Sequence, residues 1–174
     1  MPAVTEAGMT IRRARTGDVR AIRSIVDSYA ADRILLAKDL VTLYEDVPDF
    51  RVAVTAAGEV IGCGAVHVMW EDIAEVRTLA VMPSHRGAGV GSALLDELLR
   101  TASELGVTRV ACLTFEVDFF ARHGFTPAED VDVAPEVFIQ MVRSSDEGIA
   151  EFLDLERVRP NTLGNARMIR HLSQ

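Results

Sequence analysis

The sequence predicts a mixed α/β fold, in the α+β sense, with a sheet that helices cover. Strand-like segments at 50–56 and 59–70 flank Ala57-Gly58, a pair that suits a hairpin turn. The next four segments alternate between a strand pattern and a helical period: 74–81, 89–105, 107–115 and 116–125. A hairpin followed by strand–helix–strand–helix predicts a sheet of mixed strand directions packed against helices.

The N-terminal part supplies one further strand and two helices. Residues 1–9 are expected to form a loose tail, and residues 10–14 the first strand. Thr16 or Asp18 is suited to cap the helix that follows. The apolar stripe of that helix consists of Val19, Ile22, Ile25, Val26 and Tyr29. Residues 38–47 predict a second, shorter helix.

Glycine and proline mark the ends of the later elements. Pro83 ends one strand, and Gly106 and Gly124 end the two helices of the alternating segments. From residue 135 the pattern weakens. It predicts a helix over 135–143, a polar bend at RSSDEG, a second short helix and a last strand near RMIRHL. The length of 174 residues suits one domain over 1–174.

Composition excludes several classes of partner. A net charge of −8 argues against nucleic acid, which calls for a basic face. No segment approaches the apolar length of a membrane helix, and no apolar signal-peptide core is present. Cys63 and Cys112 lie in apolar stretches and are expected to be buried thiols. The four histidines lack metal-ligand spacing. We therefore expect a cytoplasmic protein without metal, membrane or nucleic-acid partners.

A glycine-rich stretch, HRGAGVGSALL at 85–95, lies between a predicted strand and a predicted helix. It places Gly87, Gly89 and Gly91 where the helix offers free N–H groups and the positive end of its dipole. Glycine lets an anion approach the backbone closely. The alternative is a tight turn with close helix packing. Neither the dinucleotide-binding spacing nor the P-loop ending is present.

Arg86, Gly89 and Gly91 occupy the fixed positions of the Arg/Gln-x-x-Gly-x-Gly/Ala signature, and the stretch resembles that of the GCN5-related N-acetyltransferases. FFARHGF at 119–125 resembles the later helix motif of this family. The resemblance implies a mostly antiparallel mixed sheet with helices on both faces, and acetyl-CoA as co-substrate. It implies the following cofactor-binding residues: Leu79, Val81, Arg86, Gly87, Ala88, Gly89, Val90, Gly91, Ser92 and Phe120.

Further segments narrow the resemblance. RILLAKDLVTLYEDVPDF at 33–50, EVRTLAV, LTFEVDFFARHGF and NARMIRHL resemble the short form of the amino-acid N-acetyltransferases that make N-acetylglutamate for arginine biosynthesis. This implies transfer of acetyl to the α-amine of L-glutamate or L-glutamine, with 135–174 on the acceptor side. The sequence does not decide between a monomer and a homodimer. The alternatives are an acetyltransferase for another amine, such as lysine, a protein N-terminus, a polyamine or an aminoglycoside, and a non-catalytic acetyl-CoA-binding module.

The resemblance also implies roles in the chemistry. Glu75 is the candidate base that takes a proton from the attacking amine, directly or through water. The backbone N–H near Leu79 is the candidate donor to the oxyanion. Many relatives have a tyrosine at the position of Phe120 as acid for the departing thiolate, and a thiol of pKa about 8.5 leaves reasonably well without one. His123 and Tyr44 remain alternative acids.

A dicarboxylate acceptor or its amide calls for cationic and amide groups. Strand alternation puts Arg77 on the same face as Glu75, about 7 Å away. Lys38 falls in the segment that holds substrate in relatives, and Asn165 and Arg167 fall in the tail motif that closes on it. The alternatives are an ion pair between Arg77 and Glu75, and solvated side chains at the other three positions.

Overall fold

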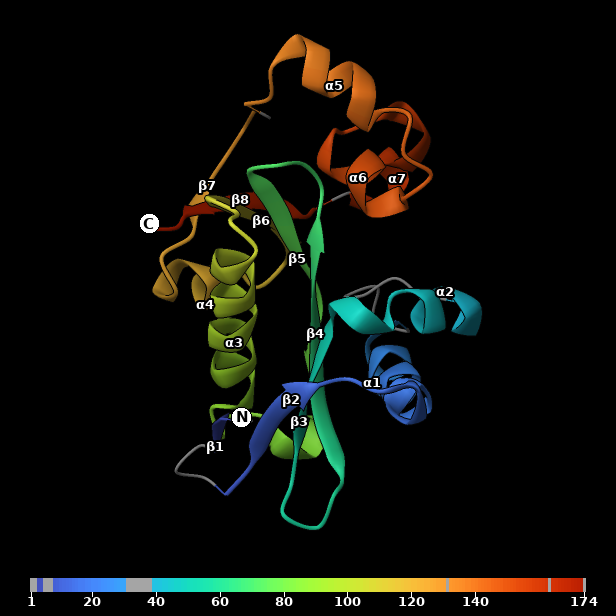
Figure 1. Ribbon diagram of the computed structural model, residues 1–174, viewed down its shortest axis with the longest axis vertical. Coiled ribbons are helices and arrows are strands. Elements are labelled where there is room, and N and C mark those ends of the chain that lie inside the picture. The colour runs from blue at the N-terminus through green and yellow to red at the C-terminus, as the bar shows by residue number, and fades with distance from the viewer. Residues whose placement is uncertain (1–2, 5–7, 31–38, 131, 163, 174) are drawn as a thin grey trace. The chain divides into compact units, whose positions relative to one another are not determined.

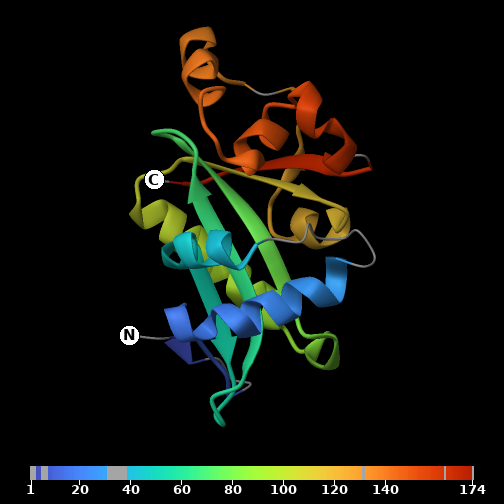
Figure 2. The same cartoon turned by 90° about the vertical axis from the view of Figure 1, so that its right-hand side faces the viewer.

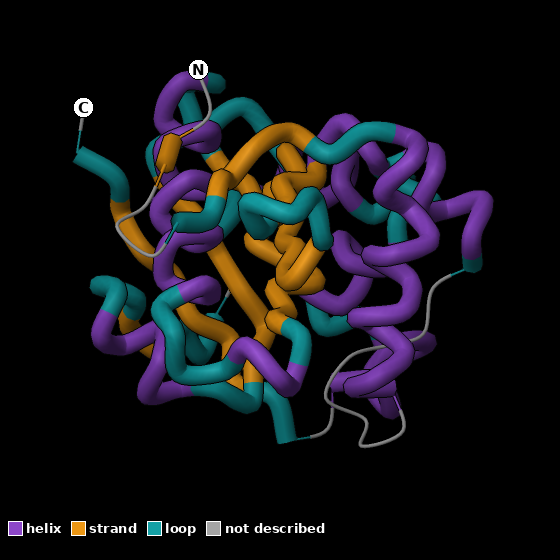
Figure 3. Tube along the Cα trace, turned by 90° about the horizontal axis from the view of Figure 1, so that it is seen from below, coloured by secondary structure: helices purple, strands orange, loops and turns teal. Residues whose placement is uncertain are grey.

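The computed structural model describes residues 3–4, 8–30, 39–130, 132–162 and 164–173 (Figure 1). The chain forms two compact units, Met1–His67 with Val76–Thr101, and Val68–Glu75 with Ala102–Gln174. The division passes through β4 (Val60–Val68), β5 (Ile73–Val81) and α3 (Val90–Glu104). Helices and strands are distinguished by colour in Figure 3. Within the described part of the chain, no helix has both the length and the apolar character to cross a bilayer.

The strands of the first unit are antiparallel. β2 (Thr10–Arg13) pairs with β3 (Phe50–Val54), and β3 pairs with β4. The predicted hairpin is present, and the Thr55 N–H donates to the Glu59 carbonyl across its turn at 2.9 Å. The N-terminal residues differ from the expected loose tail, because Ala3–Val4 form β1, antiparallel to β2. An edge strand offers unpaired backbone groups, and these residues satisfy them.

Helices cover both faces of these strands. α1 (Val19–Ala30) buries the predicted stripe against β3 and β4 on one face (Figure 2). α3 packs on the other face, and Figure 1 shows the two helices on opposite sides of β3 and β4. The short segments η1 (Thr16–Asp18), α2 (Leu40–Glu45), η2 (Val47–Asp49) and η3 (Pro83–His85) complete the unit.

Two glycines of β4 bring α3 unusually close to the strand. A Cβ atom added to Gly62 would lie 2.9 Å from Leu94 Cδ1, and one added to Gly64 would lie 2.8 Å from Leu98 Cδ1. Real Cβ atoms essentially never approach other atoms so closely. Glycine at both positions therefore lets the helix that begins at Val90 lie directly on the strand.

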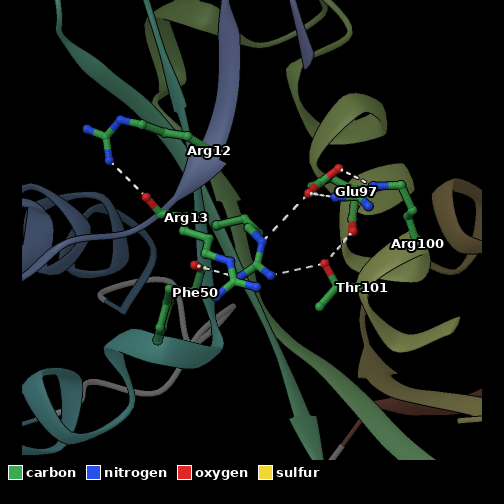
Figure 4. Close-up of polar contacts among 7 residues, drawn as sticks. Arg12, Arg13, Phe50, Glu97, Arg100 and Thr101 are labelled. Atoms are coloured by element: carbon green, nitrogen blue, oxygen red, sulfur yellow. Dashed lines mark hydrogen bonds and ion pairs between the residues drawn. The ribbon is translucent and has the colours of Figure 1, made fainter. Parts of the chain in front are cut away.

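A buried polar cluster also ties β3 to α3 (Figure 4). Arg51 is 4% exposed, and its Nη2 donates to Thr101 Oγ1 at 3.1 Å. Its Nε lies 3.7 Å from Glu97 Oε1, and its Nη1 donates to the Phe50 carbonyl at 3.2 Å. Glu97 also accepts from Arg100 at 2.6 Å. A buried cation needs such partners, so the cluster sets how α3 lies on β3.

The second unit adds a parallel strand pair. Ile73, Ala74 and Glu75 of β5 lie opposite residues 109–111 of β6 (Arg109–Thr114) in parallel register. β6 pairs antiparallel with β8 (Ala166–His171), which also pairs with β7 (Thr126–Pro127). The strand directions are therefore mixed, which confirms that part of the predicted fold class.

Short helices complete the second unit: α4 (Val117–Arg122), α5 (Pro135–Met141), α6 (Glu147–Phe152), η4 (Glu156–Val158) and α7 (Arg159–Thr162). The predicted helix, bend, short helix and last strand are present, and α7 is an additional element. α6 begins inside the predicted bend, because the Asp146 carboxylate caps it by accepting from the Ile149 N–H at 2.9 Å. The hydrophobic core of the second unit includes Met69, Ile73, Ala111, Met141, Ile149, Phe152 and Leu153.

Candidate active site

The glycine-rich stretch forms an exposed loop that leads into α3. Gly87 and Gly89 both have φ of +79°, a left-handed conformation that favours glycine. A Cβ at either position would meet no described atom within 4 Å, so backbone conformation, and not crowding, accounts for the two glycines. α3 starts at Val90, and the Ala93 N–H donates to the Gly89 carbonyl at 3.0 Å. The N–H groups before Ala93 have no partner in a helical ladder and are available to an anion.

Arg86 is held in place by a tyrosine from α1. Its Nε donates to the hydroxyl of Tyr29 at 2.9 Å, and its guanidinium carbon lies 4.8 Å from the centre of the tyrosine ring. The Tyr29 hydroxyl in turn donates to the carbonyl of Val81 at the end of β5. The helical pattern places Tyr29 only in the core stripe, since nothing in the local sequence indicates a contact 57 residues away.

β5 carries an irregularity at the position where the oxyanion donor is predicted. Thr78 has φ of +57°, which is uncommon for a residue with a side chain and marks a break in strand geometry. The thiol of Cys63 on β4 donates to the Thr78 carbonyl, with an S···O distance of 3.5 Å. No described peptide bond is cis, and in a trans peptide the C=O and N–H point in opposite directions. The N–H of Leu79 therefore points away from Cys63.

Glu75 lies in the second unit, on the part of β5 that pairs with β6. Its side chain is buried, with 5% of the residue exposed, and its Cα lies opposite Ala111. Burial raises the pKa of the neighbouring Cys112 thiol, and the negative charge of Glu75 raises it further. Glu75 therefore places a carboxylate in a site removed from bulk water.

Phe120 packs in the core of the second unit. It is 6% exposed, and its ring makes edge-on contacts with Phe119 and Phe125 at centroid distances of 5.2 and 5.1 Å. Nδ1 of His123 donates to the Phe119 carbonyl at 2.8 Å, as expected of a residue at the end of a helix. Tyr44 on α2 is 40% exposed. Phe120 has no hydroxyl, so it supplies packing and no proton.

Two predicted acceptor-binding residues lie close together at the start of β8. Arg167 Nη1 donates to the Glu129 carbonyl at 3.1 Å, and its guanidinium carbon lies 5.7 Å from the centre of the Phe152 ring. Its Nε is buried and has no hydrogen-bond partner among the described residues. Oδ1 of Asn165 is likewise buried and unpartnered within the part of the chain that the structure describes. Arg167 Nε is therefore a donor, and Asn165 Oδ1 an acceptor, that a bound molecule could pair with.

The other two acceptor candidates are placed less completely. Arg77 is half-buried on β5 in the first unit. Lys38 lies outside the described residues. Among the residues that are described, no group of three or more His, Cys, Asp or Glu side chains is arranged to hold a metal ion.

The comparisons with known proteins identify the family. The family model described as the acetyltransferase (GNAT) family matches residues 20–125, which include nearly all of α1, the loop over 86–92 and α4. The chain belongs to the GNAT acetyltransferase family. The resemblance stated from Arg86, Gly89 and Gly91 is thereby confirmed, as is the GNAT fold that it implied.

A curated relative and a crystal structure, both from Mycobacterium tuberculosis, match this chain closely. The chain is 56% identical to an amino-acid acetyltransferase of that organism over 161 residues, which cover 91% of this chain and 92% of the relative. A crystal structure from M. tuberculosis, solved in complex with CoA and NLQ, matches with a TM-score of 0.91 and 55% identity. That match covers 94% of this chain and 99% of the other.

A more distant solved structure shows the same fold. N-acetylglutamate synthase from Neisseria gonorrhoeae, complexed with coenzyme A and N-acetyl-glutamate, matches with a TM-score of 0.78 at 23% identity. The match covers 98% of this chain and 36% of that protein. At this identity the likeness concerns the fold alone.

Proposed function

We propose that this chain is an acetyl-CoA-dependent amino-acid N-acetyltransferase that acetylates the α-amine of L-glutamate or L-glutamine, the first step of arginine biosynthesis, in the cytoplasm. The observation that carries the proposal is the 56% identity to the M. tuberculosis amino-acid acetyltransferase over nearly the whole of both chains. The exposed left-handed glycines before α3 support it, because they leave backbone N–H groups open to a diphosphate.

In this proposal the loop binds the co-substrate through its backbone. The amides of Gly87 to Ser92 hold the pyrophosphate of acetyl-CoA at the N-terminus of α3, where the helix dipole favours negative charge. The residues after Val90 belong to a 15-residue helix, so their N–H groups are fixed before the ligand arrives. Leu79 and Val81 on β5 line the path of the pantetheine arm.

Glu75 and Leu79 then supply the chemistry. An amino acid's amine is mostly protonated at neutral pH, and Glu75 accepts its proton so that the nitrogen can attack the thioester carbonyl. The N–H of Leu79 donates to the oxygen that becomes negative, in the direction fixed by the Thr78 carbonyl. The thiolate of CoA leaves without an acid at position 120, because a thiol of pKa about 8.5 is an adequate leaving group.

The acceptor's carboxylate and side chain are bound by Lys38, Arg77, Asn165 and Arg167. Arg167 and Asn165 support this role most directly, because each has a buried polar atom that lacks a hydrogen bond among the described residues. Leaving such an atom unpaired costs about 1–3 kcal/mol, which a bound amino acid with matching groups would recover.

One assay tests the proposal. The purified chain is given acetyl-CoA with glutamate, glutamine, lysine, a polyamine or an aminoglycoside, and thiol release is followed together with the mass of the product. We expect release with glutamate or glutamine and acetylation of the α-amine. Release only with lysine, polyamine or aminoglycoside would assign another amine, and acetyl-CoA binding without release with any acceptor would assign a non-catalytic module.

A further inference from the structure

Tyr29 makes three contacts that meet at the entrance to the loop over 86–92. Its hydroxyl donates to the carbonyl of Val81, it accepts from Nε of Arg86, and its ring lies under the guanidinium at 4.8 Å. Tyr29 is 6% exposed and lies near the end of α1, which packs through its apolar stripe on β3 and β4. The tyrosine side chain is therefore held by the core of the first unit, and its hydroxyl reaches the loop from there.

These contacts join the two ends of the segment between β5 and the loop. Val81 is the last residue of β5, and Arg86 follows η3 five positions later. One phenol oxygen bonds to both ends of this segment, so the point at which the loop leaves the strand is held relative to α1. Gly87 and Gly89 contribute no side chains that could anchor the loop. The contact of Arg86 just before them is therefore important for the position of the loop.

We infer that Tyr29 is a positioning residue that pre-organises the loop over 86–92 and the Arg86 guanidinium for the diphosphate of the co-substrate. The inference rests on the proposed function of the loop. Arginine has five N–H donors, and the bond from Nε to Tyr29 leaves four on the two terminal nitrogens while fixing the plane in which they lie. Holding a binding group in its bound geometry raises affinity by reducing the ordering cost.

Tyr29 should affect binding of the phosphate-bearing part of acetyl-CoA and not the reaction at its thioester. Tyr29 contacts Arg86 and Val81, whereas the predicted base and oxyanion donor are Glu75 and Leu79. Loss of the Tyr29 hydroxyl should therefore weaken use of a substrate with the diphosphate and spare one without it. S-acetylpantetheine has the same thioester and pantetheine arm but no phosphate, so it reports on the chemistry alone.

The test is Tyr29→Phe, which keeps the ring and removes both hydrogen bonds. We expect the Kd of acetyl-CoA by calorimetry to rise about 10-fold, the equivalent of one lost charged hydrogen bond of ~1.4 kcal/mol. The kcat/KM for S-acetylpantetheine and the KM for the amino acid should stay within about 2-fold of the unmodified protein. Ser28→Ala is the matched control, because it removes a neighbouring hydroxyl that donates within α1, to the Ile25 carbonyl.

A double-mutant cycle with Arg86→Ala completes the test. If Tyr29 acts through Arg86, the two losses in acetyl-CoA affinity should not multiply, and the double variant should bind about as weakly as Arg86→Ala. Equal losses with acetyl-CoA and S-acetylpantetheine would overturn the inference, because they indicate a general defect in folding. Unchanged acetyl-CoA affinity in Tyr29→Phe would overturn it as well, and a matching failure of Gly89→Glu to weaken binding would place the error in the loop's assignment.

Discussion

The loop over 86–92 and the start of β8 at 165–167 each place candidate binding groups at the edge of a regular element, but they do so with different atoms. At the loop, the groups are backbone amides, and the nearby side chains of Tyr29 and Arg86 satisfy one another. At β8, the groups are side-chain atoms, and Asn165 Oδ1 and Arg167 Nε are buried without partners among the described residues. The side chains beside the loop therefore have partners, whereas these two atoms near β8 have none among the residues that the structure describes.

The difference explains what each region requires of the sequence. Backbone that must adopt φ near +79° twice in three residues requires glycine, so the loop leaves a pattern that sequence reading detects. An arginine on β8 and an asparagine just before it require no special backbone, and many surface strands have a similar composition. We therefore expect substitutions in the loop to act on co-substrate affinity and substitutions at β8 to act on the acceptor.

The largest effect should follow Gly89→Glu. A side chain at φ of +79° strains the loop, and its carboxylate would repel a bound diphosphate. Juxtaposed like charges cost several kcal/mol, so the Kd of acetyl-CoA by calorimetry should rise about 100-fold or more.

Gly58→Glu is the matched control for this variant. Gly58 has φ of +86° in the exposed hairpin turn and also has no described atom within 4 Å of an added Cβ. Gly58→Glu imposes a similar backbone strain at a position far from the loop in the sequence. The acetyl-CoA affinity of this variant should be unchanged. Equal affinity in both variants would remove the loop from the binding site.

The next effect concerns the base. Glu75→Gln keeps the size of the buried side chain and removes its capacity to take a proton. We expect kcat to fall by about 10²-fold, the low end for lost acid–base catalysis, while the Kd of acetyl-CoA stays nearly the same. Raising the pH should partly restore the rate, because more of the amine is then unprotonated. A variant with near-normal turnover at pH 7 would show that another group is the base.

Local sequence patterns predicted most helices and strands, but they could not predict contacts between residues far apart in the sequence. The helical stripe from Val19 to Tyr29 and the glycine ends of helices follow from neighbours in the sequence, and the structure contains them. The Tyr29 hydroxyl bonds and the Cys63–Thr78 contact join residues whose proximity depends on how strands and helices pack. β1 was missed because a strand of two residues is too short to show an alternating pattern.

The acceptor side is tested by Arg167→Ala. A hydrogen bond to a charged group contributes about 1.5–3 kcal/mol, so kcat/KM for the amino acid should fall by about 10- to 150-fold, with the KM of acetyl-CoA much less affected. Arg170→Ala is the control on the same strand, because Arg170 donates to the His123 carbonyl at 2.6 Å. Similar losses in both variants would point to the strand's stability instead.

Deletion of the tail is not a substitute for these point variants. β8 lies between β6 and β7 and pairs with β6 at six positions, from Arg109–His171 to Thr114–Ala166. A chain cut before residue 166 would lose an internal strand, and its inactivity would say nothing about Arg167. The point variants keep the strand and change one side chain at a time.

The smallest effect should follow Cys63→Ala. If the thiol orients the Thr78–Leu79 peptide, its loss lets the Leu79 N–H deviate from the oxyanion that it stabilises. A weak S–H···O bond contributes about 0.5–1 kcal/mol, so kcat should fall by about 2- to 5-fold with the KM of both substrates unchanged. Cys63→Ser keeps a donor at this position and should recover part of the rate.

Since Cys63 is fully buried, thermal unfolding of each variant must be measured alongside. A Cys63→Ala enzyme with unchanged kcat would mean that the positive φ of Thr78 sets the direction of the Leu79 N–H without help from the thiol.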